Sequence, residues 1–254
     1  MLGAVHFPQD MHGDCRKFTE ELAAVCATKY GVTFKQEADV FGLERREMED
    51  GQSRVVAVHT TGGRVPVSGD VVVCLGAQSD MLTKTVGVRL PIYPMKGYSL
   101  TVNVEDLART SPELLPQGLV ILEPLHTYVI RMDRNRVRFA SIAEFAGWDE
   151  RRVSAPCVRT LQARAAAWFP LLRSAVYASD ARVLTGGRPQ TPDDVPVVSA
   201  TPVSNLYVNA GQGQYGWRLA CSSGAILETI VSASPPPAQA PDITHLSLDR
   251  FRWF

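Results

Sequence analysis

A continuous apolar run that ends in a glycine turn constrains the fold of this chain more than any other feature. Residues 70–75 read Asp-Val-Val-Val-Cys-Leu, and Gly-Ala-Gln-Ser follows at once. An unbroken apolar run is typical of a strand buried on both faces, as in a parallel sheet. Because a turn and a helix follow, the pattern indicates a mononucleotide-binding layer of an α/β protein. The same order is expected again near the end, with a strand at 205–209, a glycine-rich turn and a helix from about Gly216 to Val231.

The middle of the chain carries a different pattern. Residues 98–102, 127–132 and 136–140 alternate polar and apolar side chains, which predicts an antiparallel sheet with one face toward solvent or a ligand. A second domain is therefore expected to begin near Pro91. Periodicity and turn residues also predict helices at 14–30 and 155–169, strands at 32–34 and 182–184, and a hairpin of 54–58 with 64–67.

Charge and cysteine content exclude several classes of protein. The 26 basic residues balance the 26 acidic ones, so no overall field favours nucleic acid or an anionic membrane. No run of about 20 apolar residues is present to span a bilayer. The cysteines are odd in number and scattered, which favours an intracellular, reducing compartment, with cytoplasm and mitochondrion both left open. The five histidines show no metal-ligand spacing, so no metal site is expected.

The turn at 211–216, Gly-Gln-Gly-Gln-Tyr-Gly, satisfies the G-x-G-x-x-G pattern of a dinucleotide fingerprint. The context does not, because the following helix runs into three prolines where a second parallel strand with an acidic residue is required. A plain strand-to-helix turn explains the glycines as well. In either case the amides at the helix start and its positive dipole end stabilise negative charge placed beside them.

Six segments, in order, resemble the D-amino acid dehydrogenase and glycine oxidase group of FAD-dependent oxidoreductases. The run Pro-Ile-Tyr-Pro-Met-Lys-Gly-Tyr-Ser-Leu at 91–100 is similar to the dehydrogenase branch. The similarity covers nearly all of this chain and corresponds to the C-terminal portion of the family. The segments are 7–15 (FPQDMHGDC), 74–79 (CLGAQS), 91–100, 186–189 (GGRP), 191–194 (TPDD) and 209–217 (NAGQGQYGW).

The resemblance implies an α/β (α+β) fold, in which an incomplete FAD/NAD(P)-binding Rossmann-like domain is interrupted by a mixed, mainly antiparallel substrate domain. It assigns residues 1–90 and 186–233 to the FAD-binding-type domain and 91–185 to the substrate-type domain. Residues 234–254 form a proline-rich tether and a C-terminal tail. In relatives the first βαβ unit, with the true fingerprint, precedes the position of residue 1. We therefore expect this chain to need that unit for FAD binding.

The resemblance also implies roles for single residues. Arg188 would form a bidentate pair with the substrate carboxylate, a role suited to guanidinium geometry. Tyr128 would lie near the substrate, although half-buried packing explains a tyrosine in such a strand equally well. The residues expected to contact the cofactor are Val40 at the adenine, Leu75 and Gly76 at the ADP portion, Gly187, and Gly211, Gln212, Gly213, Gln214, Gly216 and Trp217 around the flavin.

The implied activity is oxidative deamination of small D-amino acids or related amines, with hydride transfer to FAD. Two positions depart from the family: Gln212 stands where histidine is common, and Ser141 replaces a glycine. Three accounts stay open. The chain is a fragment of an active enzyme, one half of a split enzyme completed by a partner chain, or an inactive relative that serves as a structural or assembly subunit of a larger complex. The first two predict bound flavin and the third predicts none.

Overall fold

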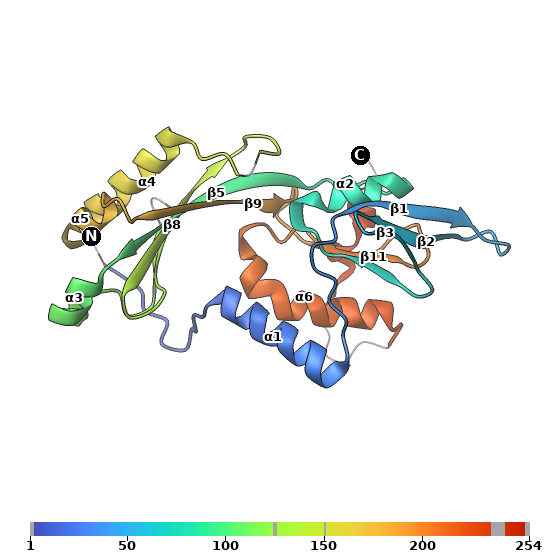
Figure 1. Ribbon diagram of the computed structural model, residues 1–254, viewed down its shortest axis with the longest axis horizontal. Coiled ribbons are helices and arrows are strands. Elements are labelled where there is room, and N and C mark those ends of the chain that lie inside the picture. Colours follow the sequence, from blue (N-terminus) through green and yellow to red (C-terminus); the bar gives the residue numbers. More distant parts are fainter. Residues whose placement is uncertain (1–2, 124–125, 150, 235–241, 252–254) are drawn as a thin grey trace. The chain divides into compact units, whose positions relative to one another are not determined.

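The computed structural model describes residues 3–123, 126–149, 151–234 and 242–251 (Figure 1). By their internal contacts they form two compact units. Whether these units correspond to a substrate domain and a cofactor domain with the boundaries given above stays a prediction, because contacts do not reveal what each unit binds. Unit 1 consists of Met1–Phe34, Gly97–Ala143 and Arg151–Thr185, and unit 2 of Lys35–Lys96, Glu144–Glu150 and Gly186–Phe254.

A five-stranded sheet in the order β6-β7-β8-β5-β9 gives unit 1 its framework. Neighbouring strands β6, β7 and β8 are antiparallel, with Tyr128 opposite Ile121 on one side and Ala140 on the other. Alternate residues such as Val129 and Phe139 are fully buried, so the expected one-sided antiparallel sheet is confirmed. The strands are β5 (Tyr93–Asn103), β6 (Leu119–Leu122), β7 (Thr127–Arg131), β8 (Arg136–Glu144) and β9 (Arg182–Gln190).

Helices cover the apolar side of this sheet. α4 (Ala155–Trp168) buries Leu161 and Ala165 in the same cluster as Val129 and Phe139, which confirms the helix expected at 155–169. Shorter helical segments complete the unit: α3 (Glu105–Thr110), η3 (Pro112–Leu114), η5 (Pro170–Leu172) and α5 (Arg173–Val176).

The first helix, α1 (Cys15–Tyr30), begins and ends as its sequence predicts. The Asp14 carboxylate accepts hydrogen bonds from the amides of residues 16 and 17, and Gly31 ends the helix at φ +67°. The strand expected at 32–34 is wrong. These residues form no strand in the structure, and the Val32 amide instead donates to the Cys26 carbonyl at the helix end, at 3.1 Å.

Unit 2 contains two three-stranded sheets, with orders β1-β2-β3 and β10-β11-β4. The first contains the expected hairpin, formed by β2 (Ser53–Thr60) and β3 (Gly63–Pro66), and adds the unexpected strand β1 (Val40–Glu47). The second consists of β4 (Val71–Val73), β10 (Val197–Ala200) and β11 (Leu206–Ala210). In it β4 and β11 are parallel, with Tyr207 opposite Val72.

Helix α6 (Gly216–Val231) has the predicted bounds and lies against β10 and β11 (Figure 1). The expectation that the run at 70–75 is buried on both faces is wrong, because Val73 is 2% exposed but Val72 is 41% exposed. Within the described part of the chain, β4 pairs with β11 alone. The remaining helical segments are η1 (Gly76–Gln78), α2 (Ser79–Thr83), η2 (Lys84–Val86), η6 (Gly213–Tyr215), η7 (Thr244–Leu246) and η8 (Leu248–Phe251).

The proline-rich tether expected from residue 234 lies mostly outside the described residues, as do the last three residues of the tail. The tail residues that are described dock on unit 2, where Leu246 is buried and Leu248 and Phe251 pack against the core.

Candidate functional site

Two turns meet at one edge of the β10-β11-β4 sheet. Because β4 and β11 are parallel, their carboxyl ends lie at the same edge, and ligands of open α/β sheets bind outside that edge. The turn after β4 contains Leu75 and Gly76, and the turn after β11 begins at Gly211. The structure therefore brings together two of the segments that the sequence predicted to contact a cofactor.

The turn after β4 is held by its own side chains. The Leu75 amide donates to the Ser79 hydroxyl at 3.1 Å, and Gly76 has φ +55°. A β-carbon built on Gly76 would lie 3.9 Å from Cγ of Pro189. Since Pro189 follows Arg188 on β9, the Gly-Gly-Arg-Pro motif and the turn after β4 lie side by side.

The thiol of Cys74, just before this turn, is not activated as a nucleophile by a lowered pKa. Partial burial raises the pKa of Cys74 above its ordinary value, and the hydrogen bond with the Asn209 backbone only partly opposes that effect. A raised thiol pKa keeps the protonated form at neutral pH.

The turn after β11 requires glycine at its first position. Gly211 has φ +83°, and a β-carbon there would lie 2.7 Å from the Thr191 methyl carbon. Gly213 has φ +53° and faces the Gln190 side chain, whose oxygen would lie 3.1 Å from an added β-carbon. The end of β9 and residue 191 therefore pack directly on the glycine turn. The sequence placed Thr191 in a motif but gave it no contact.

The start of α6 is open. Tyr215, the residue before the helix, makes no side-chain capping hydrogen bond. Gln212 instead donates from Nε2 to the Asn209 side-chain oxygen at 2.5 Å, and Trp217 is 45% exposed. Uncapped amides at the start of a 16-residue helix are suited to an anionic or electron-rich ligand.

The other predicted residues lie in different places. Arg188 is half-buried on β9, between Gly187 and Pro189, and belongs to unit 2. Tyr128 is half-buried on β7 of unit 1. The two predicted catalytic residues therefore belong to different units. Val40 begins β1 and is 39% exposed. It lies in the β1-β2-β3 sheet of unit 2, whereas the glycine turn follows β11 of the other sheet.

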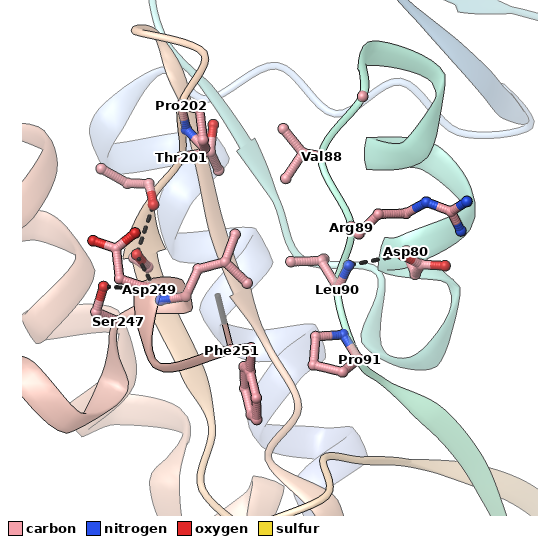
Figure 2. Close-up of a pocket in the computed structure, with 14 residues that line it drawn as sticks. Asp80, Val88, Arg89, Leu90, Pro91, Thr201, Pro202, Ser247, Asp249 and Phe251 are labelled. Atoms are coloured by element: carbon pink, nitrogen blue, oxygen red, sulfur yellow. Dashed lines mark hydrogen bonds between the residues drawn. The ribbon is translucent and has the colours of Figure 1, made fainter. Parts of the chain in front are cut away.

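A separate cavity of about 970 Å³ lies in unit 2. Figure 2 shows Val88, Leu90 and Pro91 on one side and Thr201 and Pro202 on the other, with tail residues completing the wall. Its lining is mainly apolar, and none of the predicted site residues contributes to it.

In the part of the chain that the structure describes, no three histidine, cysteine or acidic side chains gather as a metal site requires. The same residues include no helix with the length and apolar character needed to cross a membrane.

Parallel strands that lead into a glycine turn, followed by an uncapped helix, define a nucleotide-cofactor-binding α/β protein. The family of FAD dependent oxidoreductases matches residues 1–229. The chain therefore belongs to this family, and the resemblance and the fold class predicted from the sequence are confirmed.

Individual relatives are consistent with this assignment. The chain is 36% identical over 239 residues to a D-amino acid dehydrogenase of Chromohalobacter salexigens, covering 92% of this chain and 52% of the relative. It is 33% identical over 243 residues to one from Xanthobacter autotrophicus, covering 96% and 54%. The crystal structure of glycine oxidase from Geobacillus kaustophilus superposes with a TM-score of 0.72 at 28% identity, covering 89% of this chain and 55% of that one. The chain thus spans about half the length of the curated relatives it matches.

Proposed function

We propose that this chain is the part of an FAD-dependent oxidoreductase that contacts the flavin and the substrate carboxylate, and that the whole protein oxidises a small D-amino acid or related amine. The observation that carries the proposal is the convergence in unit 2 of the glycine turn, the turn after β4 and the end of β9. The names of the two curated relatives support D-amino acids as the substrate class.

The residues present fit the flavin end of the cofactor. Neither Gln212 before η6 nor Tyr215 before α6 makes a side-chain capping hydrogen bond, and the positive end of the α6 dipole would lie against the electron-rich edge of the ring. FAD, when bound, supplies the hydride acceptor for oxidation of the substrate at Cα. Arg188 would hold the carboxylate through two parallel hydrogen bonds and so orient Cα. Gly187 would keep the backbone beside it free of side chain.

An open strand edge supports the need for a further segment. Val72 of β4 is 41% exposed and Leu75 in the turn after it is 43% exposed, and in the described chain β4 pairs on one side only. An exposed edge of this kind is a template for another strand. We expect a parallel strand to occupy it, from another part of the protein or from a partner chain. The scattered cysteines, which are free thiols in the structure, support a reducing, intracellular setting for the assembled protein.

The visible absorption spectrum of the purified protein, alone and after FAD titration together with the complementing segment, tests the cofactor. Flavin bands that remain after gel filtration are expected. A preparation that stays colourless in both cases would contradict the proposal and favour a structural subunit.

Arg188→Leu is expected to weaken substrate binding in the flavin-loaded protein about 10- to 100-fold, because charge-assisted hydrogen bonds to a carboxylate contribute roughly 1.5–3 kcal/mol. The measurement is the substrate dissociation constant from the perturbation of the flavin spectrum, with FAD affinity measured in parallel. Arg182→Leu is the matched control, since Arg182 is exposed at the start of the same strand. Equal affinities in the two variants would remove the role of Arg188.

A further inference from the structure

The C-terminal tail is held on unit 2 by apolar packing and by hydrogen bonds. We call residues 243–251 the C-terminal strap. Leu246 is 8% exposed, and Leu248 and Phe251 pack on the core of unit 2. The Leu248 amide donates to the Ser199 hydroxyl of β10 at 3.1 Å. In Figure 2 the strap forms one wall of the cavity, across from the loop that carries Leu90.

Arg250 connects the strap to the loop that follows β9. Its Nε donates to the Asp193 carboxylate at 2.7 Å, and its Nη2 donates to the second carboxylate oxygen at 3.3 Å. The same Nη2 donates to the Val195 carbonyl at 2.5 Å. The Arg250 side chain is 16% exposed, so solvent screens this pair less than a surface pair.

The pKa of the Asp193 carboxyl is consistent with its pairing with Arg250. Burial by itself would raise the pKa of Asp193, but the hydrogen bonds from Arg250 and from the Val195 amide outweigh that effect and lower the pKa below its ordinary value. The carboxylate is therefore charged at neutral pH and remains available to Arg250.

The contacts continue from this loop to the glycine turn. The Val195 carbonyl that accepts from Arg250 also accepts from the Thr191 hydroxyl at 3.0 Å. The Thr191 methyl group fills the space that a side chain on Gly211 would need. A single carbonyl thus links the strap to the residue that packs on the glycine turn.

We infer that the C-terminal strap positions the glycine turn, with Arg250 as the positioning residue that fixes residues 191–195 against Gly211. Arg250 would restrain the glycine turn with or without bound flavin. The experiment is therefore carried out on the cofactor-free chain, and its outcome is independent of the function proposed above.

The test is amide hydrogen exchange of the full chain, comparing Arg250→Met with wild type. Exchange of residues 209–216 is expected to become about tenfold faster, because charged hydrogen bonds that restrain the loop are lost. Residues 53–60 of β2 should keep their rates. Arg64→Met is the matched control, since Arg64 makes an exposed two-point pair with Glu44 at 2.7 and 3.2 Å in the same unit, and it should leave residues 209–216 unchanged.

Arg250→Lys separates positioning from a loss of folding. Lysine keeps the charge pair with Asp193 but lacks the planar fork that reaches both the carboxylate and the Val195 carbonyl. An increase at residues 209–216 smaller than that of Arg250→Met, with β2 unchanged, supports the inference. Wild-type rates at residues 209–216 in Arg250→Met would overturn it. If Arg250→Met exchanges faster throughout unit 2, the result for Arg250→Lys is used instead. Faster exchange of Arg250→Lys confined to residues 209–216 supports the inference, and wild-type exchange there overturns it.

Discussion

Gly211→Ala is expected to lower the free energy of unfolding by about 3 kcal/mol, since a left-handed backbone costs a side chain roughly 1–3 kcal/mol and overpacking costs a similar amount. Both effects act at this position. Gly211 has φ +83°, and the new methyl group would lie 2.7 Å from the Thr191 methyl carbon, with the Val197 amide nitrogen at 3.5 Å. The turn cannot relieve one contact by moving toward the other. Urea denaturation of wild type and variant measures the loss.

Two further variants test the physical reason. Thr191→Ser removes the methyl group but keeps the hydroxyl that donates to Val195. The double variant Gly211→Ala, Thr191→Ser should therefore recover the stability lost to the steric clash. It should not recover the stability lost to the left-handed backbone. Gly224 lies inside α6, and among the described residues no atom beyond its chain neighbours and the backbone of its own helix lies within 4 Å of an added β-carbon, so Gly224→Ala should stabilise by about 1 kcal/mol. A Gly211→Ala protein as stable as wild type would show that the turn adapts, and the packing argument would fail.

The elements predicted best from the sequence are the helices whose first and last residues are marked by a capping residue or a glycine. Asp14 and Gly31 bound α1, and Gly216 begins α6. The strand β1 was missed because its second half, Glu-Arg-Arg-Glu at 44–47, carries four consecutive charges and no apolar alternation. Its place is set instead by pairing with β2, which local sequence does not encode.

The strand β9 was predicted too short for a related reason. The sequence supported only 182–184, because glycines and a proline follow at 186–189 and weaken a strand. In the structure β9 continues through them to Gln190. It is the last strand in the order β6-β7-β8-β5-β9, and an edge strand tolerates a proline that a central strand would not.

The candidate site was predictable in its parts but not in its contacts. Motif order located the glycine turn, Gly76 and Arg188 without a structure. The contact of Thr191 with Gly211 and the pair of Arg250 with Asp193 join residues 20 and 57 positions apart in sequence. No pattern in the sequence indicates either of these contacts, because they depend on how separate loops pack.

Asn205→Ala is expected to cost about 3–4 kcal/mol of stability, because each buried polar group left without a partner costs roughly 1–3 kcal/mol. Asn205 is 2% exposed and lies immediately before β11. Its side-chain oxygen accepts from the Val55 amide at 2.8 Å, and its nitrogen donates to the Val55 and Gly69 carbonyls at 3.0 and 2.9 Å. One amide group thus joins β2 to the segments that lead into β4 and β11. Urea denaturation, with the slope checked for two-state behaviour, measures the loss.

Ser204→Ala is the matched control for this variant. Ser204 is the preceding residue, is exposed, and donates one side-chain hydrogen bond, to the Ser53 carbonyl at 3.2 Å, so its loss should change stability by less than about 0.5 kcal/mol. Asn205→Asp keeps the acceptor for the Val55 amide but turns a negative charge toward two carbonyl oxygens. It should be as damaging as alanine at pH 7 and less damaging near pH 4, where a protonated carboxyl can donate to one of them. If Asn205→Ala behaves like Ser204→Ala, the hydrogen bonds of the Asn205 side chain to Val55 and Gly69 contribute little to stability, and the argument from buried polar groups fails.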